Sequence, residues 1–224
     1  MKYKVADFKF DLKPFNTNQE KDLLLYVALN DEYDLDIVLN ILGFEVKEET
    51  SSFIKKLLLL KLRAISVSDI INIHFTCEKC KRRSEGTLDI SSIFEISSKI
   101  KETEILKEVY SDNIDDYFKI EVDELELEEY DEYINYIQGN KADTSMKIGC
   151  KCLLCSEDNQ VSISDTNFIV KNMSETKLES LFKLISNLVY SGHYTKLDVD
   201  SMVPFEREIY VGLLNQKIEE LNKK

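Results

Sequence analysis

Two C-x-x-C pairs constrain the fold of this chain more than any other feature of its sequence. They are formed by Cys77, Cys80, Cys152 and Cys155. Two thiolates three residues apart on a tight turn can provide half of a tetrahedral zinc site, and a second pair completes it. Each pair interrupts a stretch of strand-like alternation, so the sequence predicts two β-hairpins whose tips together bind one structural Zn²⁺. A closed site of four cysteines has no position for a reacting water, which favours a structural role.

A redox function is the main alternative for a C-x-x-C pair. A thioredoxin-like pair sits at a helix N-terminus in a βαβ unit, and neither pair has that context. Residues 1–7 lack the apolar core of a signal peptide, so we expect metal ligands in a reducing compartment and no disulfide framework. No apolar run reaches about 18 residues, and we expect no membrane span.

The charge of the chain is strongly negative and unevenly distributed. The net charge is −13, and residues 102–143 hold fifteen acidic residues and three lysines. An acidic protein repels phosphate backbones, which argues against general binding of nucleic acid. The acidic segment is either a solvated insertion between the two cysteine pairs or a docking surface for a basic partner.

The order of periodic segments predicts an α+β fold. Helical spacing is expected over residues 17–30, 34–42, 52–66, 174–189 and 200–222. Strand-like alternation is expected over residues 3–12, 71–75, 87–90, 146–148 and 161–163. The acidic segment contains a further expected strand, 117–122, and a short expected helix, 130–137. Helical N- and C-terminal regions should therefore surround a zinc-ribbon-like pair of hairpins containing all four cysteines.

Three regions follow from this pattern. Residues 1–68 form an N-terminal helical region with a short leading strand, and residues 166–224 form a C-terminal helical region. Residues 69–165 form the two-hairpin region, with the acidic insertion 102–143 inside it. Because the metal would join segments on both sides of the insertion, we expect one interdependent body.

The last predicted helix carries more apolar residues than a helix needs to cover a small core. They are Ile209, Leu213, Leu214, Ile218 and Leu221. Such a face is used either for internal packing or for a helix-in-groove contact with a partner, and the sequence leaves both open.

Three other side chains could contribute to a metal site. Cys150 lies two residues before the second pair and matches Phe75 in the first hairpin, which indicates an ordinary side chain within a strand. His74 precedes the first pair by three residues and could replace a thiolate, but four cysteines already suffice. His193 follows a glycine in an expected loop and is interpreted as a surface residue.

A small basic cluster lies at the first cysteine pair. It consists of Lys79, Lys81, Arg82 and Arg83. In nucleic-acid-binding ribbons such residues contact phosphate, so the alternative function is a zinc-ribbon regulator that contacts nucleic acid or polymerase through residues 79–83. No aromatic platform is interleaved with these charges, and a solvated turn is the preferred interpretation.

Catalysis has little support in the sequence. With two histidines far apart there is no Ser–His–Asp or Cys–His arrangement to propose, and no glycine-rich phosphate loop is present. The acidic residues stand in an exposed-looking run and not in an apolar pocket that would shift their pKa values. We expect no enzyme and no small-molecule substrate.

Two stretches of the chain resemble the T4-type phage baseplate proteins that build or belong to the central hub. The first is a leucine-rich helix ending in Leu-x-Leu-Arg, then a short turn and a strand leading to the first cysteine pair; residues 58–70 read LLLKLRAISVSDI. The second follows the other cysteine pair and has the form Met-x-x-x-Glu-Arg; residues 202–207 read MVPFER. The chain departs from the family pattern at Ser68, where a turn glycine is typical. The two C-x-x-C turns also lack the proline and glycine that are common at the tips of zinc ribbons.

The resemblance implies a non-enzymatic structural or assembly subunit of a contractile-tailed phage. Its partners would be other baseplate or tail proteins, without a membrane and without a nucleic-acid partner. It would act in the host cytoplasm during assembly, and the sequence leaves open whether it remains in the baseplate of the virion.

Overall fold

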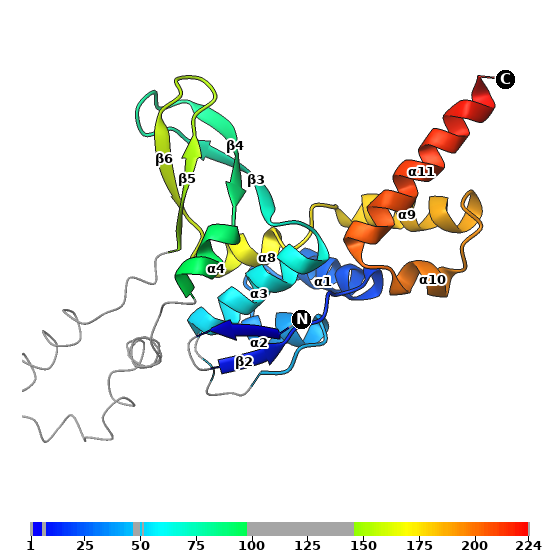
Figure 1. Cartoon of the computed structure of the whole chain (residues 1–224), viewed down its shortest axis with the longest axis horizontal. Coiled ribbons are helices and arrows are strands. Elements are labelled where there is room, and N and C mark those ends of the chain that lie inside the picture. The colour runs from blue at the N-terminus through cyan, green and yellow to red at the C-terminus, as the bar shows by residue number, and fades with distance from the viewer. Residues whose placement is uncertain (1, 6–7, 47–49, 51, 98–145, 224) are drawn as a thin grey trace, which may run out of the picture.

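The protein combines helices with three small antiparallel hairpins (Figure 1). This computed structural model describes residues 2–5, 8–46, 50, 52–97 and 146–223. The acidic segment 102–143, with its expected strand 117–122 and helix 130–137, lies outside the described residues.

The N-terminal part contains one hairpin and three helices. These elements are β1 (Lys2–Val5), β2 (Phe8–Asp11), α1 (Thr17–Leu29), α2 (Leu35–Ile41) and α3 (Ser52–Ser66). The single predicted strand over residues 3–12 is instead a pair of strands, in which Val5 lies opposite Phe8. Alternation alone does not reveal such a reversal because it continues with the same period on both strands.

Local signals explain where the first helices begin and end. Asn16, one residue before the expected helix 17–30, accepts the N–H of Gln19, and the Gln19 side chain binds back to Asn16 in a capping box. Asp34, the first residue of the expected helix 34–42, caps α2 by accepting the N–H groups of Asp36 and Ile37. Gly43 follows α2 with a φ of +75°, a conformation that favours glycine.

Helix α3 is the centre of the larger core. Four consecutive residues, Leu57 to Leu60, are at most 1% exposed, so the helix is covered on several sides. It contacts α2 and two short helices, α4 (Ser91–Ser97) and α8 (Thr166–Lys171). Each buried leucine contributes about 2 kcal/mol through burial, which makes α3 the main apolar support of the fold.

Two further hairpins stand side by side and project from the helical body (Figure 1). Their strands are β3 (Ile70–Thr76), β4 (Arg83–Asp89), β5 (Lys147–Lys151) and β6 (Asp158–Ser162). Buried and exposed residues alternate along β3 and β5, as predicted. Their turns lie at the end away from the helices, and each turn contains one C-x-x-C pair.

The C-terminal part is helical. It consists of α8, α9 (Leu178–Tyr190), α10 (Lys196–Ser201) and α11 (Pro204–Asn222). Leu181, Ile185 and Leu188 form the buried face of α9, at the predicted spacing. Together with α10 and part of α11 they form a second, smaller core. The C-terminal end of α11 extends beyond the body (Figure 1).

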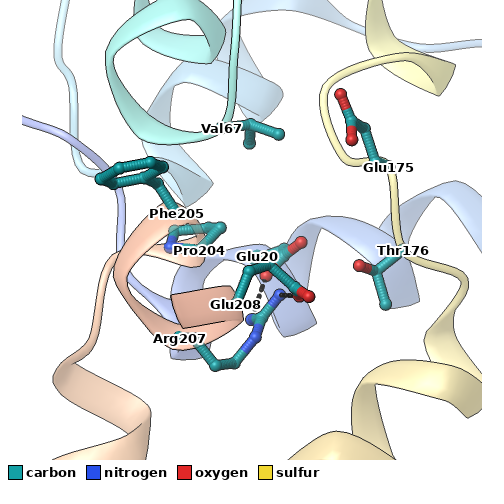
Figure 2. Close-up of a pocket in the computed structure, with 8 residues that line it drawn as sticks. All are labelled: Glu20, Val67, Glu175, Thr176, Pro204, Phe205, Arg207 and Glu208. Atoms are coloured by element: carbon teal, nitrogen blue, oxygen red, sulfur yellow. Dashed lines mark hydrogen bonds and ion pairs between the residues drawn. The ribbon is translucent and has the colours of Figure 1, made fainter. Parts of the chain in front are cut away.

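Two buried arginines connect segments that are far apart in the sequence. Arg63 at the end of α3 donates to the Asn172 carbonyl at 2.6 Å and to Glu175 at 2.9 Å. Arg207 on α11 forms an ion pair with Glu20 on α1 at 2.5 Å, and both side chains are 1% exposed (Figure 2). Arg63 and Arg207 lie in the two stretches that carry the family resemblance, so both stretches contribute a buried charged contact.

Candidate metal centre

The two cysteine turns have the same backbone conformation. We call residues 77–82 the first knuckle and residues 152–157 the second. The Lys81 N–H donates to the Cys77 carbonyl at 3.0 Å, and the Ser156 N–H donates to the Cys152 carbonyl at 2.8 Å. Lys81 and Ser156 have φ values of +56° and +59°. The chain therefore makes the same turn twice, with ordinary residues at a left-handed position where glycine is favoured.

The knuckles bring the four predicted cysteines together. The sulfurs of Cys77 and Cys155 are 3.6 Å apart, and those of Cys80 and Cys152 are 3.9 Å apart. All four sulfurs lie within 4.8 Å of one another. Zinc–sulfur bonds of about 2.3 Å in a tetrahedron place sulfurs about 3.8 Å apart, so the spacing fits a single ion. It is too long for a disulfide, whose sulfurs lie about 2.05 Å apart.

Neighbouring groups shift the thiol pKa values in opposite directions. Burial raises the pKa of Cys152, but hydrogen bonds from the Leu154 backbone and the Ser84 side chain help to lower it to about 6. The Glu157 backbone lowers the pKa of Cys155, but burial and the neighbouring sulfurs together raise it to about 12. A divalent cation bound among these sulfurs would stabilise the thiolate form of each.

Two polar side chains brace the knuckles against each other. Asn159 on β6 accepts the Glu78 N–H of the first knuckle at 2.9 Å and donates to the Cys77 sulfur at 3.7 Å. Ser84 on β4 accepts the Leu153 N–H of the second knuckle at 3.2 Å. Each hairpin thus holds the other hairpin's turn, which fixes the positions of the sulfurs.

These bracing residues were not identified from the sequence, although a signal was present. Ser84 lies seven residues after Cys77, and Asn159 lies seven residues after Cys152. The two hairpins are therefore equivalent at their bracing residues as well as at their cysteines, and approximate two-fold symmetry relates their contacts. Aligning the hairpins on their cysteines would have revealed the equivalence.

The structure separates the other candidate residues from the four-sulfur cluster. Cys150 is buried in the larger core and is not among the clustered ligands. Burial raises the pKa of the Cys150 thiol, as expected for a side chain within a strand. His74 is exposed and lies 3.8 Å from Glu85, and His193 is exposed in the loop after α9.

The basic cluster is partly neutralised. The Lys79 ammonium lies 2.6 Å from Glu157, which joins the two knuckles by an exposed ion pair. Lys81, Arg82 and Arg83 are exposed. The same end of the hairpins presents Leu153, which is 74% exposed and could not anchor a phosphate group.

Comparison with known protein families gives a match. Residues 1–198 match the family described as T4 bacteriophage base plate protein. The chain belongs to this family. The matched part of the chain contains both knuckles and Arg63, and it ends before α11. No curated protein and no solved structure matches the chain.

Family membership gives the chain a structural role in the phage baseplate, in the tail of the virion. Its partners are other tail or baseplate proteins of the phage. Within the part of the chain that the structure describes, no helix is both long enough and apolar enough to cross a membrane.

Proposed function

We propose that this baseplate protein is a non-enzymatic structural or assembly subunit of the hub whose two projecting hairpins are joined by one structural Zn²⁺. Cys77, Cys80, Cys152 and Cys155 are the ligands. The four-sulfur cluster supports the metal, because soft thiolates in a tetrahedral arrangement are typical of zinc sites. Family membership supports the baseplate role.

The metal would have a defined mechanical effect. Among the described residues the two hairpins are separate two-stranded sheets, and the knuckles meet at their far ends. Isolated two-stranded hairpins are only marginally stable in water. A Zn²⁺ ion bound to both tips would hold the two hairpins together as one rigid unit, in the manner of a zinc ribbon. The ion would also link cysteines that precede the acidic segment in the sequence to cysteines that follow it.

The regional division also belongs to the proposal. Residues 1–68, 69–165 and 166–224 would act as one interdependent body. The larger core supports this because it includes side chains from all three regions, from Leu12 through Ile148 to Met173. Arg207 adds a contact between the C-terminal and N-terminal regions.

A regulator that contacts nucleic acid through residues 79–83 has less support. Lys79 is engaged by Glu157, and the exposed tip also presents two leucines, Leu153 and Leu154. The baseplate family match covers these same residues. These observations favour the structural or assembly role in the baseplate over a regulator that binds nucleic acid.

Disrupting this gene in the phage that encodes it should prevent completion of baseplates. Electron microscopy of the lysate should show tail parts without complete baseplates, and a plasmid copy of the wild-type gene should restore them. Mass spectrometry of purified particles should then detect the protein, as expected for a structural subunit of the tail, whereas a role confined to assembly would require its absence. Normal numbers of complete baseplates without the protein would contradict the proposed function.

A further inference from the structure

An acidic pocket lies beside the buried Arg207–Glu20 pair. It has a volume of about 420 Å³ and lies between α1, the start of α11 and the segment before α9 (Figure 2). Its polar lining includes three carboxylates, from Glu20, Glu175 and Glu208, and its apolar wall comes from Val67, Pro204 and Phe205.

The pocket has an excess of negative charge. Among the described residues that line it, Arg207 is the single cation, and its guanidinium is shared between Glu20 at 2.5 Å and Glu208 at 3.3 Å. Glu175 is paired with Arg63 at 2.9 Å. The side chains of Glu175 and Glu208 are still 48% and 54% exposed, so each has oxygen surface available to a further cation.

An exposed apolar stripe on α11 begins at this pocket. Phe205, Ile209 and Leu213 follow one another at intervals of four residues and are 61%, 49% and 55% exposed. Residues four apart lie on one face of a helix. The opposite face, which includes Arg207 and Leu214, packs against the body. Helix α11 is therefore apolar on two faces, and the described residues of the chain cover only one of them.

We propose that the stripe and the pocket together form the docking site for an amphipathic basic segment of another tail or baseplate protein. The apolar side of the segment lies on Phe205, Ile209 and Leu213. One lysine or arginine of the segment enters the pocket, where its methylene groups pack on the apolar wall and its charge meets Glu175 and Glu208. This inference rests on the proposed contact-forming role and names the chemistry of the partner, and it does not depend on the metal.

The charges favour a basic partner over a second copy of this chain. Glu208 and Glu219 lie eleven residues apart, about three helical turns, and so border the stripe on the same side. A two-fold pairing of α11 would place acidic borders close together in a chain whose net charge is −13. A basic segment converts the same borders into attractive contacts.

The proposal is tested with the full chain and two synthetic helical peptides. Both carry leucines on one face; the first has arginines along the flanks, and the second has glutamates in their place. The arginine peptide should bind, measured by fluorescence anisotropy, and the glutamate peptide should not. Phe205→Ala should weaken binding by about tenfold, as expected for an exposed aromatic anchor, and Glu208→Gln by at least about threefold with a smaller salt dependence.

Matched controls separate this site from general attraction to an acidic protein. Phe182 on α9 is 49% exposed, and Glu85 on β4 is 75% exposed. Phe182→Ala and Glu85→Gln should leave peptide binding unchanged, and circular dichroism should show that all four variants are folded. Equal losses in the controls, or equal binding of the glutamate peptide, would overturn the proposed site. A concentration-dependent dimer of the chain that Phe205→Ala abolishes would also overturn it and assign the stripe to a second copy.

Failure of the docking site in the peptide test can be distinguished from failure of the proposed function in the gene-disruption test. If the peptide test fails while gene disruption still prevents baseplate completion, the assembly role stands and only this docking site is wrong. If disruption has no effect while the peptide binds as expected, the assembly role is wrong and the site remains.

Discussion

Replacement of Cys77 by serine should abolish zinc binding and destabilise the protein. Cys77 is completely buried, and its sulfur lies 3.6 Å from that of Cys155. A serine hydroxyl is a poor ligand beside three thiolates, and metal binding in such a site contributes directly to folding. We expect zinc content measured by elemental analysis to fall from about one ion per chain to near zero. The melting temperature should fall by about 10 °C or more.

Cys150 provides the matched control. It is also a buried cysteine of the second hairpin, but it is not part of the four-sulfur cluster. Cys150→Ser should retain the full zinc content, with at most a packing defect. A chelator should lower the melting temperature of the wild type and of Cys150→Ser, and it should have no further effect on Cys77→Ser. Equal zinc content in both serine variants would contradict the ligand assignment.

Replacement of Arg207 by leucine should destabilise the protein by about 3–5 kcal/mol, the usual cost of removing one partner from a buried ion pair. The change leaves the carboxylate of Glu20 buried with only neutral partners, among them the Ser174 hydroxyl at 2.6 Å. It also removes the bond from Arg207 to Thr17 at 3.2 Å. Urea unfolding measures the loss, and its midpoint should shift without a large change in slope.

Two further variants identify the buried charge as the cause. Arg82→Leu removes an exposed arginine at the first knuckle and should change the free energy of unfolding by less than about 0.5 kcal/mol. Replacing both Glu20 and Arg207 by leucine should recover part of the loss, because no unpaired charge remains in the interior. If Arg207→Leu unfolds at the same urea concentration as the wild type, α11 is not anchored as described.

The metal ligands could be predicted from sequence because their spacing carries the chemistry. A C-x-x-C pair between alternating segments specifies both a turn and two ligands. The bracing residues Ser84 and Asn159 have no such signature. A polar residue in an alternating strand is normally assigned to solvent. Here each one binds a backbone N–H of the other hairpin, and that partner is known only once the two hairpins are placed together.

The helices show a similar limit. The long helices α1, α3 and α9 were predicted because each covers several turns of 3.6-residue periodicity. The short helices α4, α8 and α10 have seven, six and six residues, which is too few for a periodic pattern to stand out. Helix α2 also has seven residues, but Asp34 and Gly43 mark its two ends in the sequence.

Helix α11 was predicted with one apolar face, whereas the structure divides those residues between two. Leu214 packs toward α9, and Ile209 and Leu213 face away. The sequence of α11 contains more apolar residues than its packing needs. Which of these residues are buried depends on how the helix packs against the rest of the protein, and the sequence does not give that packing. The burial of Arg63 and Arg207 could not be predicted either, because arginine is rarely buried without a partner. The sequence does not reveal that Glu20 lies beside Arg207.

The most direct test of the proposed zinc-joined hairpins is X-ray absorption at the zinc edge on the purified full-length protein. We expect about one zinc per chain with four sulfur neighbours at about 2.3 Å and no nitrogen or oxygen ligand. That result would place Cys77, Cys80, Cys152 and Cys155 around one ion. A folded protein without zinc, or a zinc ion bound by fewer than four sulfurs, would contradict the proposed clamp.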